Sequence, residues 1–258
     1  CSGGVCTATA SHAVLNANDL ASMLSTGNVT VASGSQAWDI NVDTLVSWTS
    51  TNRLTLDSYR SITFNKPVVV AGTGAVTITT NDGGSGGDFR FFKTGHIKFW
   101  DMTSNLVIND NRYALAKSIA QMKKLIHRGR GERYIALAKK VNATRYRGGT
   151  IPVAPDVLEG LGNTISNLTI GDGTSRGNVG LFAGVAVVRD LGLINVNIKG
   201  LGSVQRVGAI AGEAGGTILN CFVTGSVSAT GSQSRVGGIA GDVITSGVVA
   251  NSQSSATV

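Results

Sequence analysis

The chain of 258 residues has little of several residue types, and each shortage excludes a class of protein. Three cysteines are too few for a disulfide framework, and three widely scattered histidines give little support to a zinc site. Only 14% of the residues are charged while 42% are apolar, which argues against a disordered chain. No apolar run is long enough to cross a membrane as a helix. Three prolines and 5% aromatic residues, beside 35 glycines, favour a repetitive β structure over a compact mixed domain.

What the sequence does have is a six-residue pattern that recurs in its last third. The segments 179–184, 207–212 and 236–241 read VGLFAG, VGAIAG and VGGIAG. Repetition at such a period predicts a stacked array, because one unit is too short to bury an apolar face alone. The residues predicted to stack in register are Val179, Val207 and Val236; Phe182, Ile210 and Ile239; and Leu193, Ile218 and Val249. Their β-branched, aliphatic or aromatic side chains favour short strands, so we predict an all-β fold, a right-handed parallel β-helix or solenoid.

The glycines and asparagines of the repeat are predicted to be structural. We expect the glycines to lie at corners, where the chain needs a positive φ or a close approach between coils. They are Gly180, Gly184, Gly208, Gly212, Gly237 and Gly241. Four asparagines are predicted to share one column, in which they either bond to one another through their amides or fill turns. They are Asn167, Asn195, Asn220 and Asn251.

The Val-Gly-x-Ile-Ala-Gly units resemble the glycine-rich GLUG repeats of large bacterial surface and secreted adhesins. The preceding segment 159–170, EGLGNTISNLTI, resembles the entry to such repeats, and the resemblance extends from there to the C-terminus. These adhesins are similar to filamentous haemagglutinins. The resemblance therefore implies two-partner secretion through an outer-membrane partner barrel, a secreted or cell-surface location, and a role in attachment. More loosely, 54–56 and 58–64 resemble coils of haemagglutinin secretion domains.

Three regions are predicted: secretion-domain-like β-helix coils over 1–110, a basic helical insertion over 111–150, and repeat coils over 151–258. Near the start, Cys1 and Cys6 are close enough to pair as a disulfide, with a lipid-modified Cys1 as the alternative. A short helix follows, with Asn18 as its cap and an apolar face at Leu20, Met23 and Leu24. No signal peptide precedes Cys1 and the array stops inside a coil. We therefore expect a processed form or a fragment of a longer protein, or an end that associates with another copy.

The segment 111–150 carries the charge. It contains eleven of the 22 lysines and arginines and one of the 15 acidic residues, a net charge of +10 against −3 for the remainder. Apolar residues recur there at helical spacing, at Leu115, Ile119, Met122 and Ile126, with Asp110 or Asn111 as the cap and Gly129 as the end. The basic side chains are candidates for anion or glycan binding, and a solvated face without a ligand is the alternative. The candidates are Lys117, Lys123, Lys124, Arg128, Arg130 and Arg133.

Other candidate features lie before this segment. The aromatic stretches 89–92 and 96–100 either stack on sugars or bases, or form a sheet with one buried and one wet face. The pairs Asp39 with Asp43 and Asp82 with Asp88 are the carboxylates nearest to a pectin-cleaving arrangement, but no motif brings an arginine, lysine or histidine to them. An isolated Thr-x-Thr at 77–79 is too little to predict an ice-binding face.

The sequence thus predicts a non-catalytic adhesin or structural stalk that mediates attachment. Its expected partner is a host or surface glycan or receptor, or an acidic polysaccharide; DNA is not expected. No cofactor and no metal are expected. The alternatives are a carbohydrate- or polyanion-binding module that uses the basic insertion and, third, a polysaccharide-degrading β-helix enzyme.

Overall fold

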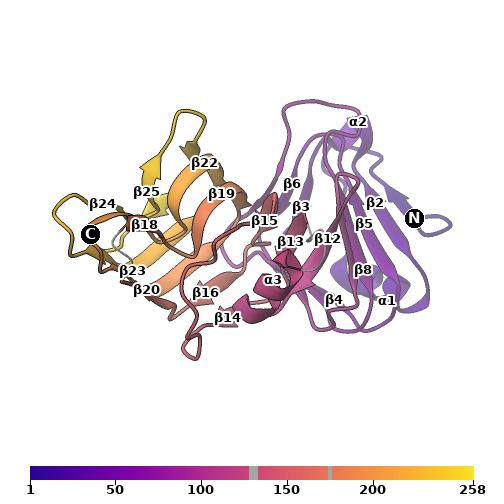
Figure 1. The fold of residues 1–258 in the computed structure, drawn as a ribbon. Helices are drawn as coiled ribbons and strands as arrows, with labels where there is room; N and C mark the ends of the chain where they lie inside the picture. Colours follow the sequence, from indigo (N-terminus) through magenta and orange to yellow (C-terminus); the bar gives the residue numbers. More distant parts are fainter. Residues whose placement is uncertain (128–132, 174–175) are drawn as a thin grey trace. The chain divides into compact units, whose positions relative to one another are not determined.

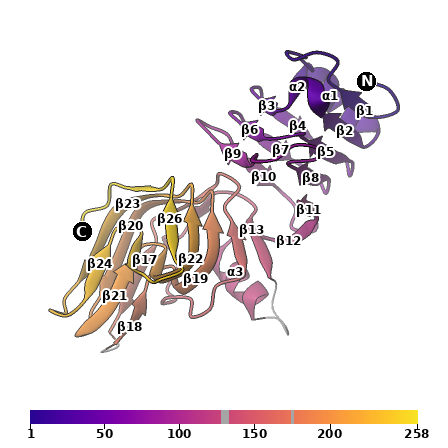
Figure 2. The ribbon, with the colours of Figure 1, turned by 90° about the horizontal axis from the view of Figure 1, so that it is seen from above.

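The computed structural model describes residues 1–127, 133–173 and 176–258, and the chain forms two compact units, Cys1–Leu115 and Ala116–Val258. Each unit is built from short strands that wind into the coils of a β-solenoid (Figures 1 and 2), about 9 turns in all. The predicted parallel β-helix is therefore confirmed. Among the described residues, no helix combines the length and apolar character needed to span a membrane.

In the first unit, successive coils contribute one strand to each of three parallel sheets. The first sheet contains β1 (Val5–Thr7), β2 (Val29–Ala32), β5 (Arg53–Asp57), β8 (Ala75–Thr79) and β11 (Asn105–Ile108). The second contains β3 (Ile40–Val42), β6 (Ile62–Phe64) and β9 (Phe89–Phe91), and the third contains β4 (Val46–Trp48), β7 (Val68–Val70) and β10 (Ile97–Phe99). Strand residues alternate between the interior and the surface, as their period of two requires, so Leu54 and Leu56 are buried while Thr55 lies outside.

The N-terminal elements of this unit differ slightly from expectation. The helix α1 (Ala17–Thr26) begins two residues earlier than a cap at Asn18 predicts, because the side chain of Asn16 caps it by accepting a bond from the Asn18 backbone. Leu20 and Leu24 of its apolar face are buried. A second short helix, α2 (Gly34–Ala37), follows β2. Cys1 and Cys6 form the disulfide that their spacing predicts.

The predicted helix over 111–128 is wrong in its first part. Residues Asn111–Ala116 form strand β12, which runs back antiparallel to β11, with Ile108 opposite Asn111. Asn109 and Asp110 both have positive φ, 44° and 63°, which suits a tight hairpin turn. Asp110 therefore turns the chain and caps no helix.

The helix α3 (Ile119–Ile126) belongs to the second unit. Its cap is Ser118, whose hydroxyl accepts a bond from the backbone N–H of Gln121 at 3.1 Å, while the Gln121 side chain accepts one from the backbone of Lys117. This arrangement is close to a capping box. Ile119 and Met122 are buried against the solenoid core, as the predicted apolar face requires. The predicted end at Gly129 lies outside the described residues.

The second unit has three parallel sheets of its own. The first contains β13 (Tyr134–Leu137), β15 (Val157–Glu159), β19 (Phe182–Arg189) and β22 (Ala211–Leu219), and β22 pairs with both β25 (Ala240–Val243) and β26 (Val248–Ala250). The second contains β14 (Val141–Asn142), β16 (Thr164–Ser166), β20 (Gly192–Gly200), β23 (Phe222–Ala229) and β27 (Gln253–Ser254), with β17 (Thr169–Asp172) also paired to β20. The third contains β18 (Arg176–Val179), β21 (Val204–Gly208) and β24 (Arg235–Gly237).

The repeat stacks in the predicted register along only part of its length. Val179, Val207 and Val236 are direct neighbours in successive coils, as predicted. Phe182 lies opposite Ala211 rather than Ile210, because the chain gains one residue at the corner between these strands. Leu193 is not in register with Ile218. Instead Leu193 pairs with Val223, and Ile218 pairs with Val188 and Val249 on a different sheet.

The asparagines lie in two columns at different corners of the coil, so the single predicted column is wrong. In one, Asn195 Nδ2 donates to Asn167 Oδ1 at 2.8 Å, and Asn167 Nδ2 donates to Asn142 Oδ1 at 3.2 Å. In the other, Asn220 Nδ2 donates to Asp190 Oδ1 at 3.1 Å, and the Asn220 backbone N–H donates to the carbonyl of Ala250, the residue before Asn251. All four predicted asparagines have φ between 48° and 57°, a left-handed conformation that asparagine tolerates.

None of the six repeat glycines has a positive φ, and most of them allow a close approach between coils, while Gly237 allows one within its own corner, to Ala240. A Cβ at five of them would lie 2.1 to 2.5 Å from a backbone atom; these are Gly180, Gly208, Gly212, Gly237 and Gly241. Gly184 differs, since its Cβ would meet nothing nearer than the Glu213 oxygen at 3.7 Å, an ordinary contact.

Candidate functional site

The six basic candidates do not converge on one site. Lys117 precedes α3, whereas Lys123 and Lys124 lie in its last turn. Arg133 is exposed and forms an ion pair with Asp156, and this hydrogen bond raises the pKa of its guanidinium. Arg128 and Arg130 lie outside the described residues. The lysines of α3 therefore supply diffuse positive charge, while the charge of Arg133 is already compensated.

A pocket of about 440 Å³ lies elsewhere in the same basic segment. Its walls come from the loop that follows β14 and from strand β17. The lining residues are Thr144, Tyr146, Arg147, Gly148, Gly149, Thr169 and Gly171. None of them was among the candidates from the sequence, because a loop closes a pocket through its own turns and these have no periodic signature.

The loop is shaped by its own hydrogen bonds. Asn142 Oδ1 accepts bonds from both the backbone N–H and the hydroxyl of Thr144, at 3.1 and 2.6 Å, which turns the chain sharply after β14. The Tyr146 hydroxyl then donates to the Gly149 carbonyl at 2.7 Å. A Cβ at Gly148 would lie 2.5 Å from that hydroxyl oxygen, so this position of the Tyr146 side chain requires a glycine at 148. The loop is thus closed around a half-buried aromatic ring.

Arg147 supplies the charge of the pocket. Its Nη1 donates to the carbonyls of Thr144 and Tyr146, at 2.7 and 3.0 Å, which holds the guanidinium against the loop. Within the described part of the chain, no carboxylate pairs with it. Burial raises the pKa of the Tyr146 phenol, so the ring stays neutral at physiological pH. A fixed guanidinium beside an aromatic ring and hydroxyl groups is suited to an acidic sugar, whose carboxylate or sulfate the remaining N–H groups can bind.

The aromatic stretches form strands with one buried and one wet face. Phe89 and Phe99 are buried, while Arg90 points outward and Trp100 is 60% exposed. The ammonium of Lys98 lies 4.2 Å from the centre of the Trp100 ring. On the outer face, the side chains of Lys98 and Trp100 therefore contact each other.

Two of the candidate carboxylates, Asp39 and Asp43, are engaged in structural contacts. Asp39 and Asp43 lie before and after β3, and Asp43 accepts a bond from Asn65. The carboxylate of Asp39 is held by Arg60, whose hydrogen bonds are the main cause of its lowered pKa. Sequence reasoning missed this arginine because it belongs to the next coil. The pairing of Ile40 with Ile62 brings the two residues together, and that register is visible only once the coils are aligned.

No protein-family model, no curated protein and no solved structure matches this chain. Among the described residues, no group of three or more histidine, cysteine, aspartate or glutamate side chains is placed to hold a metal ion. The assignment of function therefore depends on the geometry of the sites themselves.

Proposed function

We propose that this chain is a non-catalytic segment of a secreted or cell-surface bacterial adhesin, whose loop pocket at Tyr146 and Arg147 binds an acidic polysaccharide. The observation that carries this proposal is an uncompensated guanidinium fixed at the wall of a pocket. The resemblance of the 179–184, 207–212 and 236–241 repeats to GLUG repeats supports the adhesin role. It also supports export through a partner barrel in the outer membrane.

Two properties of the second unit suit this role. Parallel coils give a stiff support, because each coil is hydrogen-bonded to its neighbours over its length. The net charge of +10 over residues 111–150 attracts polyanions over a distance of the order of a Debye length, roughly 10 Å at moderate salt. The lysines of α3 would thus raise the rate of encounter, and Arg147 would fix the acidic group.

The test is the binding of the full chain to polygalacturonate and to heparin, measured by biolayer interferometry across a salt series. Replacing Arg147 with alanine should weaken binding about 10-fold or more, because a hydrogen-bonded charge pair contributes roughly 1.5–3 kcal/mol. Arg147→Lys keeps the charge but loses the planar fork, so we expect a smaller loss. The matched control is Lys124→Ala, which removes an exposed charge outside the pocket and should change affinity less than about twofold.

Because Arg147 also holds two loop carbonyls, each variant is checked for an unchanged melting curve. Equal losses in Arg147→Ala and Lys124→Ala would show that diffuse charge, and not the pocket, carries the binding. No binding of the wild-type chain to either polymer would refute the polyanion ligand.

A further inference from the structure

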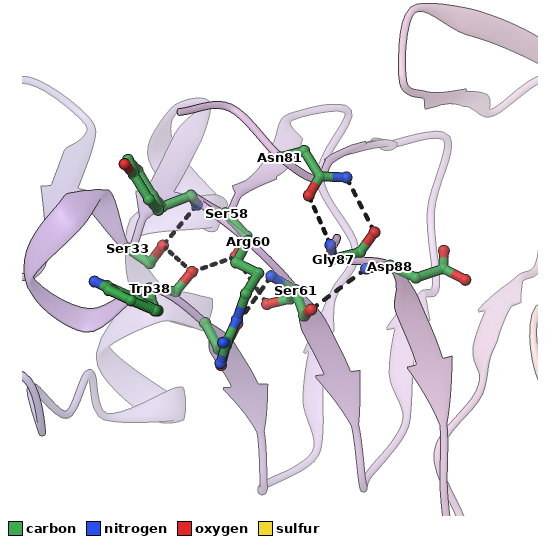
Figure 3. A network of polar contacts seen from close by, with 10 residues as sticks. Ser33, Trp38, Ser58, Arg60, Ser61, Asn81, Gly87 and Asp88 are labelled. Atoms are coloured by element: carbon green, nitrogen blue, oxygen red, sulfur yellow. Dashed lines mark hydrogen bonds and ion pairs between the residues drawn. The ribbon is translucent and has the colours of Figure 1, made fainter. Parts of the chain in front are cut away.

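We propose that the corner formed by Trp38, Asp39, Tyr59 and Arg60 in the first unit is a second binding site, for the ring of a neutral sugar. The corner lies between α2 and β3 and is completed by the start of the next coil (Figure 3). It shares no residue with the Arg147 pocket, so each proposal can be tested independently of the other.

The first observation is backbone strain at an exposed tryptophan. Trp38 has φ 59° and ψ −53°, and the Asp39 N–H donates to the Ala37 carbonyl at 2.6 Å across it. This is a γ-turn of the positive-φ type, which is rare and strained, and a bulky residue there is an outlier. The side chain is nevertheless 51% exposed, so the strain does not serve to bury the ring in the core.

The second observation is the set of contacts that hold this strained residue. The Trp38 carbonyl accepts bonds from the hydroxyl of Ser33 at 3.0 Å, the hydroxyl of Ser58 at 3.0 Å and the backbone N–H of Arg60 at 2.8 Å (Figure 3). Ser33 also accepts a bond from the Tyr59 backbone, and both serines are buried. Several hydrogen bonds thus hold Trp38 in its strained conformation. Strained residues held in this way are typical of functional sites.

The third observation is a surface formed by the rings of Trp38 and Tyr59, which we call the aromatic shelf. The Trp38 and Tyr59 rings lie 6.3 Å apart at 35°, and the Arg60 guanidinium lies over Trp38, 5.1 Å from the ring centre. The glycine-rich loop backs the tyrosine, since a Cβ at Gly83 would come within 2.5 Å of that ring. Asn81 closes this loop with two hydrogen bonds to Gly87 (Figure 3). The rings are therefore fixed before any ligand arrives.

The fourth observation is a matched donor and acceptor at the edge of the shelf. Asp39 accepts two bonds from Arg60, at 2.9 and 2.5 Å, and one from the Ser61 backbone. Both side chains of the ion pair are partly exposed, and Arg60 Nη1 has no hydrogen-bond partner among the described residues. A sugar hydroxyl can accept from this N–H while its neighbour donates to the Asp39 carboxylate.

These features point to a sugar that carries no net charge. The Arg60 charge is already matched by Asp39, so nothing in the corner attracts an anion strongly. A flat aromatic ring beside paired polar groups fits the apolar face and the hydroxyls of a pyranose. The surroundings are serine, asparagine and glycine, whereas a protein interface would require a wider apolar patch.

The experiment screens the full chain on an array of neutral oligosaccharides from β-glucan, mannan, galactan and chitin, and measures the best ligand by titration. Trp38→Gly removes the ring and permits the positive φ, so it should weaken binding about 30-fold or more while leaving the melting temperature equal or higher. Trp38→Phe should give a smaller loss. Trp100→Ala is the control, because Trp100 is also exposed in this unit and also contacts a cation, and it should change affinity less than about twofold.

Two results would overturn the proposal. The first is the absence of binding to every neutral oligosaccharide on the array, which would leave a protein as the ligand of this corner. The second is binding that Trp38→Gly and Trp100→Ala reduce equally. Arg60→Lys is a second variant, which keeps the charge but loses the planar fork and should weaken sugar binding. Its melting curve shows whether the fold is retained.

Discussion

Two glycines that occupy the same position in successive repeats are expected to respond in opposite ways to substitution by alanine. Gly184 ends the first repeat and Gly212 ends the second. A Cβ at Gly212 would lie 2.5 Å from the backbone nitrogen of Val179 and 2.6 Å from two backbone atoms of Asn178, whereas a Cβ at Gly184 meets only an oxygen at 3.7 Å. The difference arises because Gly212 faces a preceding repeat coil and Gly184 does not.

The magnitudes follow from these distances. At Gly212 the colliding atoms belong to the backbone, so the two coils must separate by several tenths of an ångström. Overpacking of this kind typically costs about 1–3 kcal/mol. Alanine also reduces the freedom of the unfolded chain, which stabilises by about 0.4–1 kcal/mol where the native backbone accepts it. We therefore expect Gly212→Ala to be destabilising by about 1–2 kcal/mol and Gly184→Ala to be neutral or stabilising by up to about 1 kcal/mol.

Urea unfolding followed by circular dichroism measures both values. Amide hydrogen exchange then shows whether the loss in Gly212→Ala is centred on Val179, the residue that its Cβ would strike. Equal destabilisation by the two substitutions would refute the reasoning, because it would mean that repeat position, and not contact with the preceding coil, sets the requirement for glycine. A larger loss at Gly184 would contradict the described coil packing itself.

Three further predictions test other features. Asn195→Ala should destabilise by about 1–2 kcal/mol, because alanine loses the amide ladder and is strained at φ 53°, and Asn195→Gly should recover the backbone part in urea unfolding. Burial raises the pKa of the Cys221 thiol to about 12, so thiol reagents should label Cys221 only after unfolding, and rapid labelling of the native chain would contradict its burial. The Arg60 hydrogen bonds lower the pKa of Asp39 in the folded chain, so its ionised form stabilises the fold above about pH 4, the pKa of an unfolded aspartate. The difference in melting temperature between wild type and Asp39→Asn should therefore shrink as the pH falls below this value, and a difference independent of pH would argue against the ion pair.

Short-range patterns in the sequence were enough to predict the strands and the solenoid. The alternation at Leu54, Thr55 and Leu56 places two leucines inside and a threonine outside, as observed. The valines of the repeat are in the predicted register because one turn of the coil separates each from the next. Local periodicity therefore defines both the element type and, where the turns are equal in length, the stacking.

Register failed wherever a corner changes length. The corner between Val207 and Ala211 has one residue more than the corner between Val179 and Phe182, which moves Phe182 out of the predicted register. A further register shift follows between Val185 and Val187. The four asparagines, spaced 28, 25 and 31 residues apart, divide between two corners of the coil. Corner lengths depend on backbone packing between coils, which no single repeat contains.

Contacts between coils were hidden for the same reason. Arg60 reaches Asp39 across one full turn of the coil. Thr30, Thr55 and Thr77 are cross-strand neighbours on the outer face, although they lie far apart in the sequence. The start of α3 was predicted wrongly for a different reason, because a helix and a hairpin strand compete for residues 111–116. Residues 111–116 fit a helical spacing at Leu115, but the turn at Asn109 and Asp110 favours a hairpin, and the hydrogen bonds to β11 decide the outcome.

The shared position of Val207 and Val236 in successive coils also bears on how such a chain changes in evolution. Recombination between the two repeats would delete residues 208–236 and join Val207 to Gly237, which follows the same valine in the next repeat. The shortened chain would keep its corner glycine and its apolar column, and the reverse exchange would add a coil. Length can therefore vary in steps of about 4.8 Å, the spacing of neighbouring strands. The loop after β14 lies outside the exchanged segment, so the reach of the solenoid and the chemistry of its pocket can be selected separately.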